Sequence, residues 1–206
     1  YKSADAYLLS RYSDVEAAAR NPTLVRSLEA FMNPGAVNAQ QRARDWHDMP
    51  NHERFVQFSL LERDGATHFR LRVIVLRALS RRLVDRQRGM IQKYVDQLLD
   101  QLLQHREFDF VADLASHVPG HIIGHLLGVP DEDCPQLRIW SENIVQFFDV
   151  GRTPAHKLLA ENATTEFYFY LSGLIAERRN KPQDDLISSL VAAQEAGEMS
   201  ELELIS

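Results

Sequence analysis

The chain has 206 residues, of which 45% are hydrophobic and 25% charged, and it contains 9 Gly and 8 Pro. This composition is typical of a globular protein with a sizeable core and excludes a disordered or collagen-like chain. The formal net charge of −6 argues against binding nucleic acid or anionic lipid through bulk charge. A single cysteine, Cys134, excludes a disulfide framework. No apolar run approaches the ~18 residues of a membrane span and no signal peptide is apparent, so we expect a cytoplasmic protein.

The first part of the chain mixes short elements with an irregular segment. Residues 6–12 combine β-formers with apolar residues and predict a short strand. Residues 14–20 predict a short helix, which ends at the Asn-Pro pair of residues 21–22. Residues 29–62 contain turn signals without a clear period and predict a long irregular segment. Such segments are uncommon inside a compact domain and are usually functional.

From residue 66 onward the sequence predicts helices almost throughout. Ile91, Val95, Leu98 and Leu102 form one stripe of an amphipathic helix. Residues 108–111 alternate and predict a second short strand. The predicted helices cover residues 85–104, 119–127, 131–148, 155–179, 184–195 and the segment from 200 onward. The fold class is therefore mainly α with a small β component, in a single domain over residues 1–206.

The densest charge feature lies between residues 63 and 88, a segment with eight arginines and two aspartates. On a helical wheel Arg70, Arg77 and Arg81 share one face, whereas His68 and Arg72 lie on the opposite side. The first face is either a solvated surface or a docking stripe for an acidic partner protein. If it faces solvent, the other two cations point inward and need an anion, such as the carboxylate of a ligand.

Three histidines recur at every fourth position, His117, His121 and His125, a spacing that lets imidazoles share a helix face and a metal ion. Pro119 is predicted to start the helix after the first of them, which leaves one i, i+4 pair. No carboxylate is arranged nearby in the sequence. We therefore expect no metal ligands within the chain.

Several segments resemble bacterial cytochrome P450 monooxygenases. Residues 64–72 (DGATHFRLR) resemble the D-P-P-E-H-x-R-L-R segment that opens the family's helix C, with Gly65, Ala66 and Thr67 replacing its two prolines and glutamate. Five further segments match in the family's order, from its first strands and helix B to the start of its helix I: residues 7–15, 126–133 (LLGVPDED), 140–142, 175–188 and 200–206. The chain is thereby identified as a member of this family that covers the N-terminal half of the fold, helices B to H and the start of helix I.

The resemblance implies roles for individual residues. His68 and Arg72 correspond to positions that bind a propionate of haem b. Residues up to about 28 correspond to the first strands and helix B, residues 29–62 to the B–C substrate-recognition loop, and residues 66–206 to helices C to the start of I. The implied substrate pocket includes Val56, Phe58, Phe147 and Phe148. The implied docking surface for an acidic ferredoxin or flavodoxin includes Arg70, Arg77 and Arg81.

The function implied for the intact protein is that of a soluble haem-thiolate monooxygenase, an iron-containing oxidoreductase. It would hydroxylate an apolar organic substrate with O2 and two electrons from a redox partner, as a monomer without nucleic-acid or membrane partners. The chain contains neither E-x-x-R nor the family's cysteine loop, and the acidic neighbours of Cys134 disfavour a thiolate there. We expect the cysteine that serves as the axial ligand of the haem iron to lie outside this chain. The chain alone is therefore predicted to be inactive as an enzyme.

Two other functions remain open at this stage. A non-catalytic helical remnant of the same fold would bind a hydrophobic ligand or a protein partner without haem. A DNA-binding regulator would use the arginine-rich segment on phosphates, but the net charge and the lack of a helix-turn-helix signature argue against it.

Overall fold

The computed structural model describes residues 7–25, 35–36, 48–105, 107–149 and 151–206. These residues are mostly helical, and none of them forms a β-strand. Three short 3₁₀ turns, η2, η4 and η5 (Leu60–Glu62, Asp131–Asp133 and Gln146–Phe148), and one π-helical turn, η3 (Phe110–Ala115), connect the helices. The helices are α1 (Tyr12–Ala19), α3 (Pro50–Phe58), α4 (Gly65–Ala78), α5 (Arg81–Leu102), α6 (His117–Leu127), α7 (Cys134–Val145), α8 (Pro154–Asn180), α9 (Leu186–Glu195) and α10 (Glu201–Ile205).

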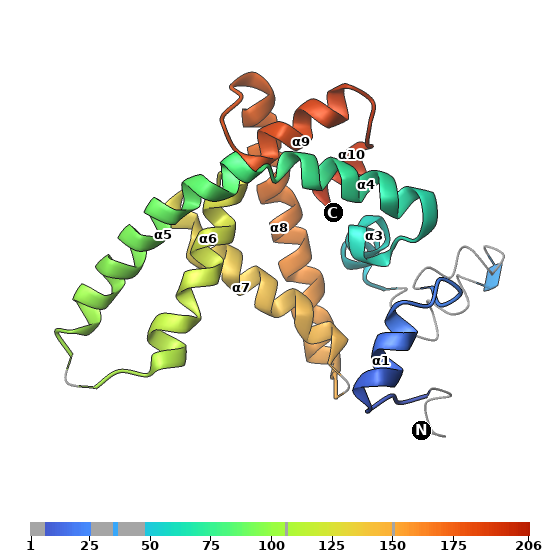
Figure 1. The fold of residues 1–206 in the computed structure, drawn as a ribbon, viewed down its shortest axis with the longest axis horizontal. Helices are drawn as coiled ribbons and strands as arrows, with labels where there is room; N and C mark the ends of the chain where they lie inside the picture. Colours follow the sequence, from blue (N-terminus) through green and yellow to red (C-terminus); the bar gives the residue numbers. More distant parts are fainter. Residues whose placement is uncertain (1–6, 26–34, 37–47, 106, 150) are drawn as a thin grey trace.

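Helix α8 is the central element of this arrangement. It packs against α3, α7 and α9, and Figure 1 shows it running through the middle of the molecule. Helices α5 and α6 form an antiparallel pair on one side of α8, while α3 lies on the other side. None of the described helices combines the length and the apolar composition that crossing a bilayer requires.

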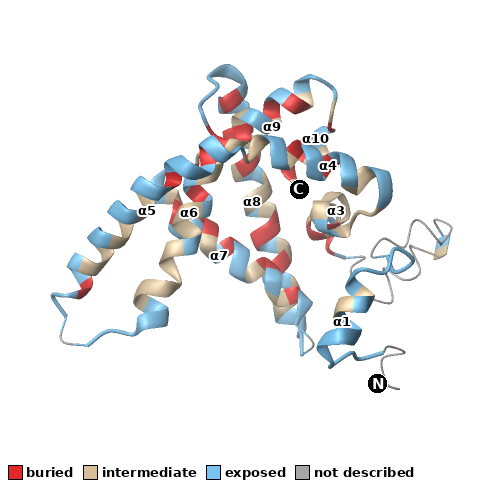
Figure 2. Cartoon of the chain, in the orientation of Figure 1, coloured by how far each residue is buried: buried red, intermediate tan, exposed pale blue. Residues whose placement is uncertain are grey.

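The main core lies where α4, α8, α9 and α10 meet the connection between α6 and α7. Figure 2 shows the buried segments gathered there, whereas α1 has no buried residue. Apolar side chains of α8 and α9 pack there against apolar side chains of α4, α7 and α10. The principal members are Leu71, Ile74, Val129, Leu137, Leu174, Ile175, Ile187, Val191 and Ile205.

The predicted helices over residues 14–20, 85–104, 119–127, 155–179 and 184–195 are confirmed, with ends that differ by a few residues. The helix predicted over residues 131–148 is divided into η4, α7 and η5. Gly128 ends α6 in the left-handed conformation, with φ +84°, as expected of a C-terminal glycine.

The two predicted strands are absent from the described residues. Tyr7 to Ser10 have no regular structure, and Tyr7 is 99% exposed. At residues 108–111 the Asp109 side chain accepts hydrogen bonds from the backbone of Val111 and Ala112, both at 2.8 Å, which starts the helical turn η3. A four-residue alternation is too short to outweigh this local cap.

The segment expected to be irregular contains a helix, α3. Residues 29–34 and 37–47 of this segment lie outside the described residues. The carboxylate of Glu161, on α8, accepts hydrogen bonds from the backbone N–H of Asn51 and His52 at 3.1 and 2.9 Å. These are amides of the first turn of α3, which a carboxylate satisfies and stabilises. A partner more than 100 residues away supplies the cap, so the local sequence did not predict the helix.

A buried ion pair joins the ends of three helices. Arg178, near the end of α8, is 3% exposed and donates from Nε to the carboxylate of Asp185 at 2.6 Å. Its Nη2 donates to the Gly128 carbonyl oxygen at the end of α6, also at 2.6 Å. Asp185 in turn caps α9 by accepting from the Ser188 backbone N–H at 2.7 Å. A Cβ at Gly128 would lie 2.1 Å from the Asp185 carboxylate, so this contact requires glycine.

Replacing Arg178 with alanine is predicted to lower the free energy of unfolding by about 3–5 kcal/mol, because it leaves the Asp185 carboxylate buried without its charged partner. Urea denaturation measures this change. The matched control is Arg179→Ala, since Arg179 is more exposed and pairs with Glu201 at the surface. The control is expected to cost about 1 kcal/mol or less. Equal losses in the two variants would contradict the role assigned to Arg178.

Candidate functional site

Helix α4 presents three different faces. Leu71 and Ile74 are buried in the main core. Phe69, Val73 and Leu76 are 70%, 44% and 57% exposed, and their spacing places them on one stripe opposite the core face. Such a stripe of exposed apolar side chains beside charged residues is a candidate binding surface.

Two cations lie along one edge of this exposed stripe. Arg72 is exposed and falls on the stripe by its spacing from Phe69 and Leu76, while His68, one turn earlier, is half-buried. Neither side chain makes a hydrogen bond or ion pair with the described residues. The expectation that Arg72 packs inward is wrong for this chain, since the face that packs inward is that of Leu71 and Ile74.

The three arginines expected to form one stripe do not share a helix. Helix α4 ends at Ala78, and Ser80 starts α5 by accepting from the Leu83 backbone N–H at 3.3 Å. Arg81 therefore belongs to α5, where its side chain is 94% exposed and lies 3.5 Å from the Asp85 carboxylate.

Arg70 and Arg77 are engaged within the chain. Arg70 donates to the Glu198 carbonyl at 2.6 Å and to the Glu203 carboxylate at 2.5 Å. Arg77 pairs with the carboxylate of Glu198. These contacts hold α4 to α10, through Glu203, and to the connection between α9 and α10, through Glu198. The positive charge of Arg70 and Arg77 is therefore partly neutralised by acidic residues from a distant part of the chain, which a helical wheel of α4 does not include.

Helix α4 begins at Gly65, one of the residues that replace the prolines of the D-P-P-E-H-x-R-L-R segment. Gly65 has φ +60°, a conformation that proline cannot adopt and that other residues adopt only with strain. The glycine therefore permits a different backbone path into α4 from the one that two prolines would impose.

An apolar cleft of about 780 Å³ opens between α3, α6 and α7. Most of its lining residues are apolar, and its polar ones are Ser59, Glu62, Ser116, Arg138, Ser141, Glu142 and Ser206. Two of the predicted pocket residues, Val56 and Phe148, line it. Its apolar walls include Val56, Leu60, Ile123, Leu127, Val145 and Phe148.

The other two predicted pocket residues do not line this cleft. Phe147 is 1% exposed and packs in a small core cluster with Met49 and Ala160. Its ring lies 5.8 Å from that of Phe148, so it supports the cleft wall from behind. Phe58 lies on α3 with the Arg63 guanidinium 5.0 Å from its ring centre.

Helix α6 also contributes to the cleft, which the sequence alone did not predict. Pro119, Ile123 and Leu127 all line it, and Ile123 is 53% exposed. They recur at every fourth position, so they share one face of the helix. This spacing was a detectable signal for a second apolar face, although it resembles that of an ordinary core helix.

A buried histidine stands behind the cleft. His52 is fully buried, with Nδ1 3.1 Å from the Thr164 hydroxyl and its ring 4.9 Å from that of Phe147. Burial lowers the pKa of His52 to about 4, so the imidazole is neutral at pH 7. It serves packing between α3 and α8.

Comparison with known proteins gives the family. No family model matches the chain. It is 34% identical over 202 residues to the polyketide biosynthesis cytochrome P450 PksS of Bacillus subtilis, covering 98% of this chain and 47% of that protein. It is 30% identical over 203 residues to the mycinamicin IV hydroxylase/epoxidase of Micromonospora griseorubida, covering 98% of this chain and 46% of that protein.

Solved structures agree with the sequence comparison. The structure of PksS matches with a TM-score of 0.77 at 34% identity, over 98% of this chain and 46% of that one. Epothilone B-bound cytochrome P450epoK matches with a TM-score of 0.84 at 26% identity, over 100% of this chain and 50% of that one. The chain belongs to the cytochrome P450 family. It spans about half the length of these P450 relatives, which fits the predicted N-terminal half of the fold.

Cys134, the single cysteine of this P450 chain, lies in the main core and not on the exposed face of α4. Cys134 is 4% exposed and belongs to the main core, on which the opposite face of α4 packs. Burial and then the carboxylates of Asp131, Asp133 and Glu132 raise the pKa of the Cys134 thiol. The direction of this shift agrees with the expectation from its acidic neighbours.

Proposed function

We propose that the protein to which this chain belongs is a haem-thiolate monooxygenase. It inserts one oxygen atom of O2 into an apolar organic substrate, with two electrons from a redox partner. The observation that carries the proposal is the outer face of α4, where His68 and Arg72 lie beside exposed apolar side chains.

The outer face of α4 suits haem b. A flat apolar macrocycle with two carboxylates needs an apolar surface and nearby cations, and the stripe of Phe69, Val73 and Leu76 with His68 and Arg72 offers both. Arg72 would hold a propionate through charge-assisted hydrogen bonds, with His68 as a second donor. Bound haem iron would supply O2 binding and activation, which in this family requires a thiolate ligand. We propose that this thiolate lies outside the 206 residues.

The apolar cleft would bind the substrate. Val56, Ile123 and Phe148 give it apolar walls from three elements, so binding would come mainly from burying apolar substrate surface and excluding water. Phe147 and His52 would hold Phe148 in place from behind. The names of two relatives refer to polyketide biosynthesis and to mycinamicin IV. These names support a bulky, largely apolar substrate of the polyketide class for this protein.

Arg72→Ala is predicted to weaken haem binding in the full-length protein. Hydrogen bonds to a charged group contribute about 1.5–3 kcal/mol, which corresponds to roughly 10- to 100-fold in the haem dissociation constant. The rate of haem transfer to excess apomyoglobin measures the loss. Arg72→Lys is expected to be intermediate, because it keeps the charge without the planar fork.

Arg88→Ala is the matched control, since Arg88 is an exposed arginine on α5. It is expected to lose haem at the rate of the unmodified protein. Haem retention unchanged by Arg72→Ala would remove Arg72 from the haem site.

We also propose that an acidic ferredoxin or flavodoxin docks on the surface that carries Arg70, Arg77 and Arg81. Arg81 is the most exposed of the three, and its ion pair with Asp85 is weak at this exposure. Arg81→Glu is therefore predicted to slow reduction by the donor several-fold at low ionic strength, and high salt is expected to reduce the difference.

Arg20→Glu is the control for this experiment, because Arg20 is also highly exposed and also pairs with an acidic residue four positions away, Glu16. It lies on α1 and is expected to leave the reduction rate unchanged. Stopped-flow absorbance follows the reduction. Equal rates for the unmodified protein and Arg81→Glu at low salt would contradict docking at Arg81.

A further inference from the structure

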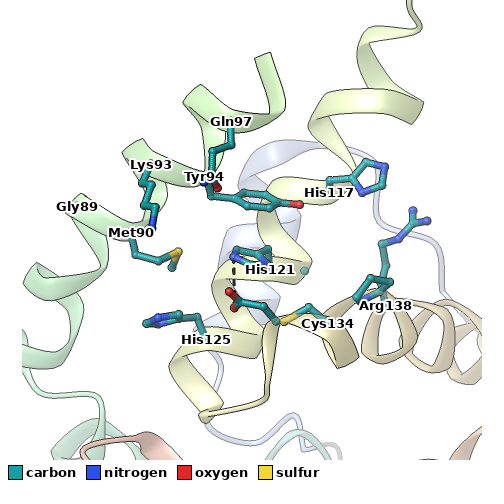
Figure 3. A pocket seen from close by; sticks show the side chains of 13 residues that line it. Gly89, Met90, Lys93, Tyr94, Gln97, His117, His121, His125, Cys134 and Arg138 are labelled. Atoms are coloured by element: carbon teal, nitrogen blue, oxygen red, sulfur yellow. Dashed lines mark ion pairs between the residues drawn. The ribbon is translucent and has the colours of Figure 1, made fainter. Parts of the chain in front are cut away.

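A second pocket lies on the other side of α6 from the apolar cleft, between α5, α6 and the start of α7. It has a volume of about 630 Å³. Figure 3 shows His121 in its middle, with Tyr94 on one side and Cys134 on the other. The haem and substrate sites proposed above use none of these residues.

Three potential metal ligands converge in this pocket. His121 Nε2 lies 3.7 Å from Asp131 Oδ1, the ion pair drawn as a dashed line in Figure 3. With Cys134 Sγ these atoms all lie within 4.8 Å of one another. They come from the middle of α6, from η4 and from the first residue of α7. The histidine spacing in the sequence pointed to His125 as a partner, whereas the fold supplies a carboxylate and a thiol.

The turn between α6 and α7 brings these groups together. Gly128 ends α6, and the chain then folds back so that η4 and α7 start beside the helix they follow. At Gly124 a Cβ would lie 2.4 Å from Cys134 Sγ, so the sulfur approaches α6 closely only because this residue is glycine. The His121 ring stacks on Tyr94 of α5 at 3.7 Å between centroids and 9° between planes, which fixes its orientation.

The donor set matches a borderline divalent cation. Nitrogen, sulfur and carboxylate oxygen are all ligands of zinc, and one thiolate with one carboxylate neutralises a charge of +2. Tetrahedral zinc with these ligands places the donor atoms about 3.3–3.6 Å apart. The His121–Asp131 distance is already close to this range. The Asp131 side chain is 72% exposed, so it can rotate to close the remaining gap to the sulfur.

We propose that His121, Asp131 and Cys134 form a zinc site, with the fourth position open to water. Binding replaces the S–H bond of Cys134 with a Zn–S bond and releases the proton to solvent, without any change in oxidation state. The cation also supplies the positive charge that a thiolate needs among the carboxylates of this segment. Zinc would clamp α6 to the start of α7 and stabilise the folded protein.

The test uses full-length protein dialysed with Zn²⁺ and then against buffer. X-ray absorption at the zinc edge reports the ligands of zinc alone, so haem iron does not interfere. We expect one zinc per chain with one sulfur ligand, and in Cys134→Ser we expect the sulfur contribution to disappear. Calorimetric titration is expected to show that His121→Ala and Asp131→Asn each weaken zinc binding by more than about tenfold, since a direct ligand contributes at least as much as a supporting group.

His117→Ala is the matched control, because His117 lines the same pocket without belonging to the three ligands. Its zinc affinity is expected to equal that of the unmodified protein. Asp131→Asn changes an exposed side chain, so it tests the site even if Cys134→Ser fails to fold. No bound zinc, zinc without a sulfur ligand, or an affinity unchanged by Asp131→Asn would each overturn the proposal.

Discussion

The buried Arg178–Asp185 pair is the interaction on which the rest of this structure depends. A guanidinium and a carboxylate taken out of water must find all their partners within the protein, because each buried charge left unpaired costs several kcal/mol. Arg178 satisfies this requirement only when the end of α6, the end of α8 and the start of α9 meet at one point. The requirement fixes the relative position of three helices.

The position of α4 follows from that arrangement. Leu71 and Ile74 pack on the core that α8 and α9 create, and the ion pairs of Arg70 and Arg77 attach α4 to the segment after α9. With two sides occupied, the side that carries Phe69, Arg72 and Val73 faces outward. In the apolar cleft, too, a buried residue positions an exposed one, because the buried Phe147 packs against the exposed Phe148. The proposed haem face thus depends on residues on other sides of α4, and the proposed substrate cleft depends on Phe147, which does not line it.

The sequence predicted most of the helices but not all of the contacts between them. Amphipathic periodicity and capping signals act over a few residues, so α5, α6 and α8 were found from local patterns alone. Helix α3 was missed because its first amides bind Glu161, which is 109 residues away from His52 in the chain. The arginine stripe was drawn as one face because the break at Ser80 was not recognised, and the partners Glu198 and Glu203 lie far along the chain.

The same distinction applies to the two sites. The resemblance of residues 64–72 to the P450 helix C segment pointed to His68 and Arg72, and the structure places them beside the exposed apolar stripe of α4. The histidine spacing, by contrast, gave no sign of the Asp131 and Cys134 side chains that the fold brings close to His121. Asp131 reaches His121 only through the turn at Gly128. The local sequence shows which side chains could be ligands, whereas the tertiary fold determines which of them lie close together.

If the outer face of α4 belongs to a haem-thiolate enzyme, the full-length protein binds haem through a thiolate. The absorption spectrum of the reduced full-length protein under carbon monoxide is the decisive measurement. We expect a strongly red-shifted Soret band, typical of thiolate-ligated haem. A purified, folded protein that takes up no haem, or whose Soret band shows no thiolate ligand, would contradict it. It would favour a helical remnant that binds a hydrophobic ligand instead.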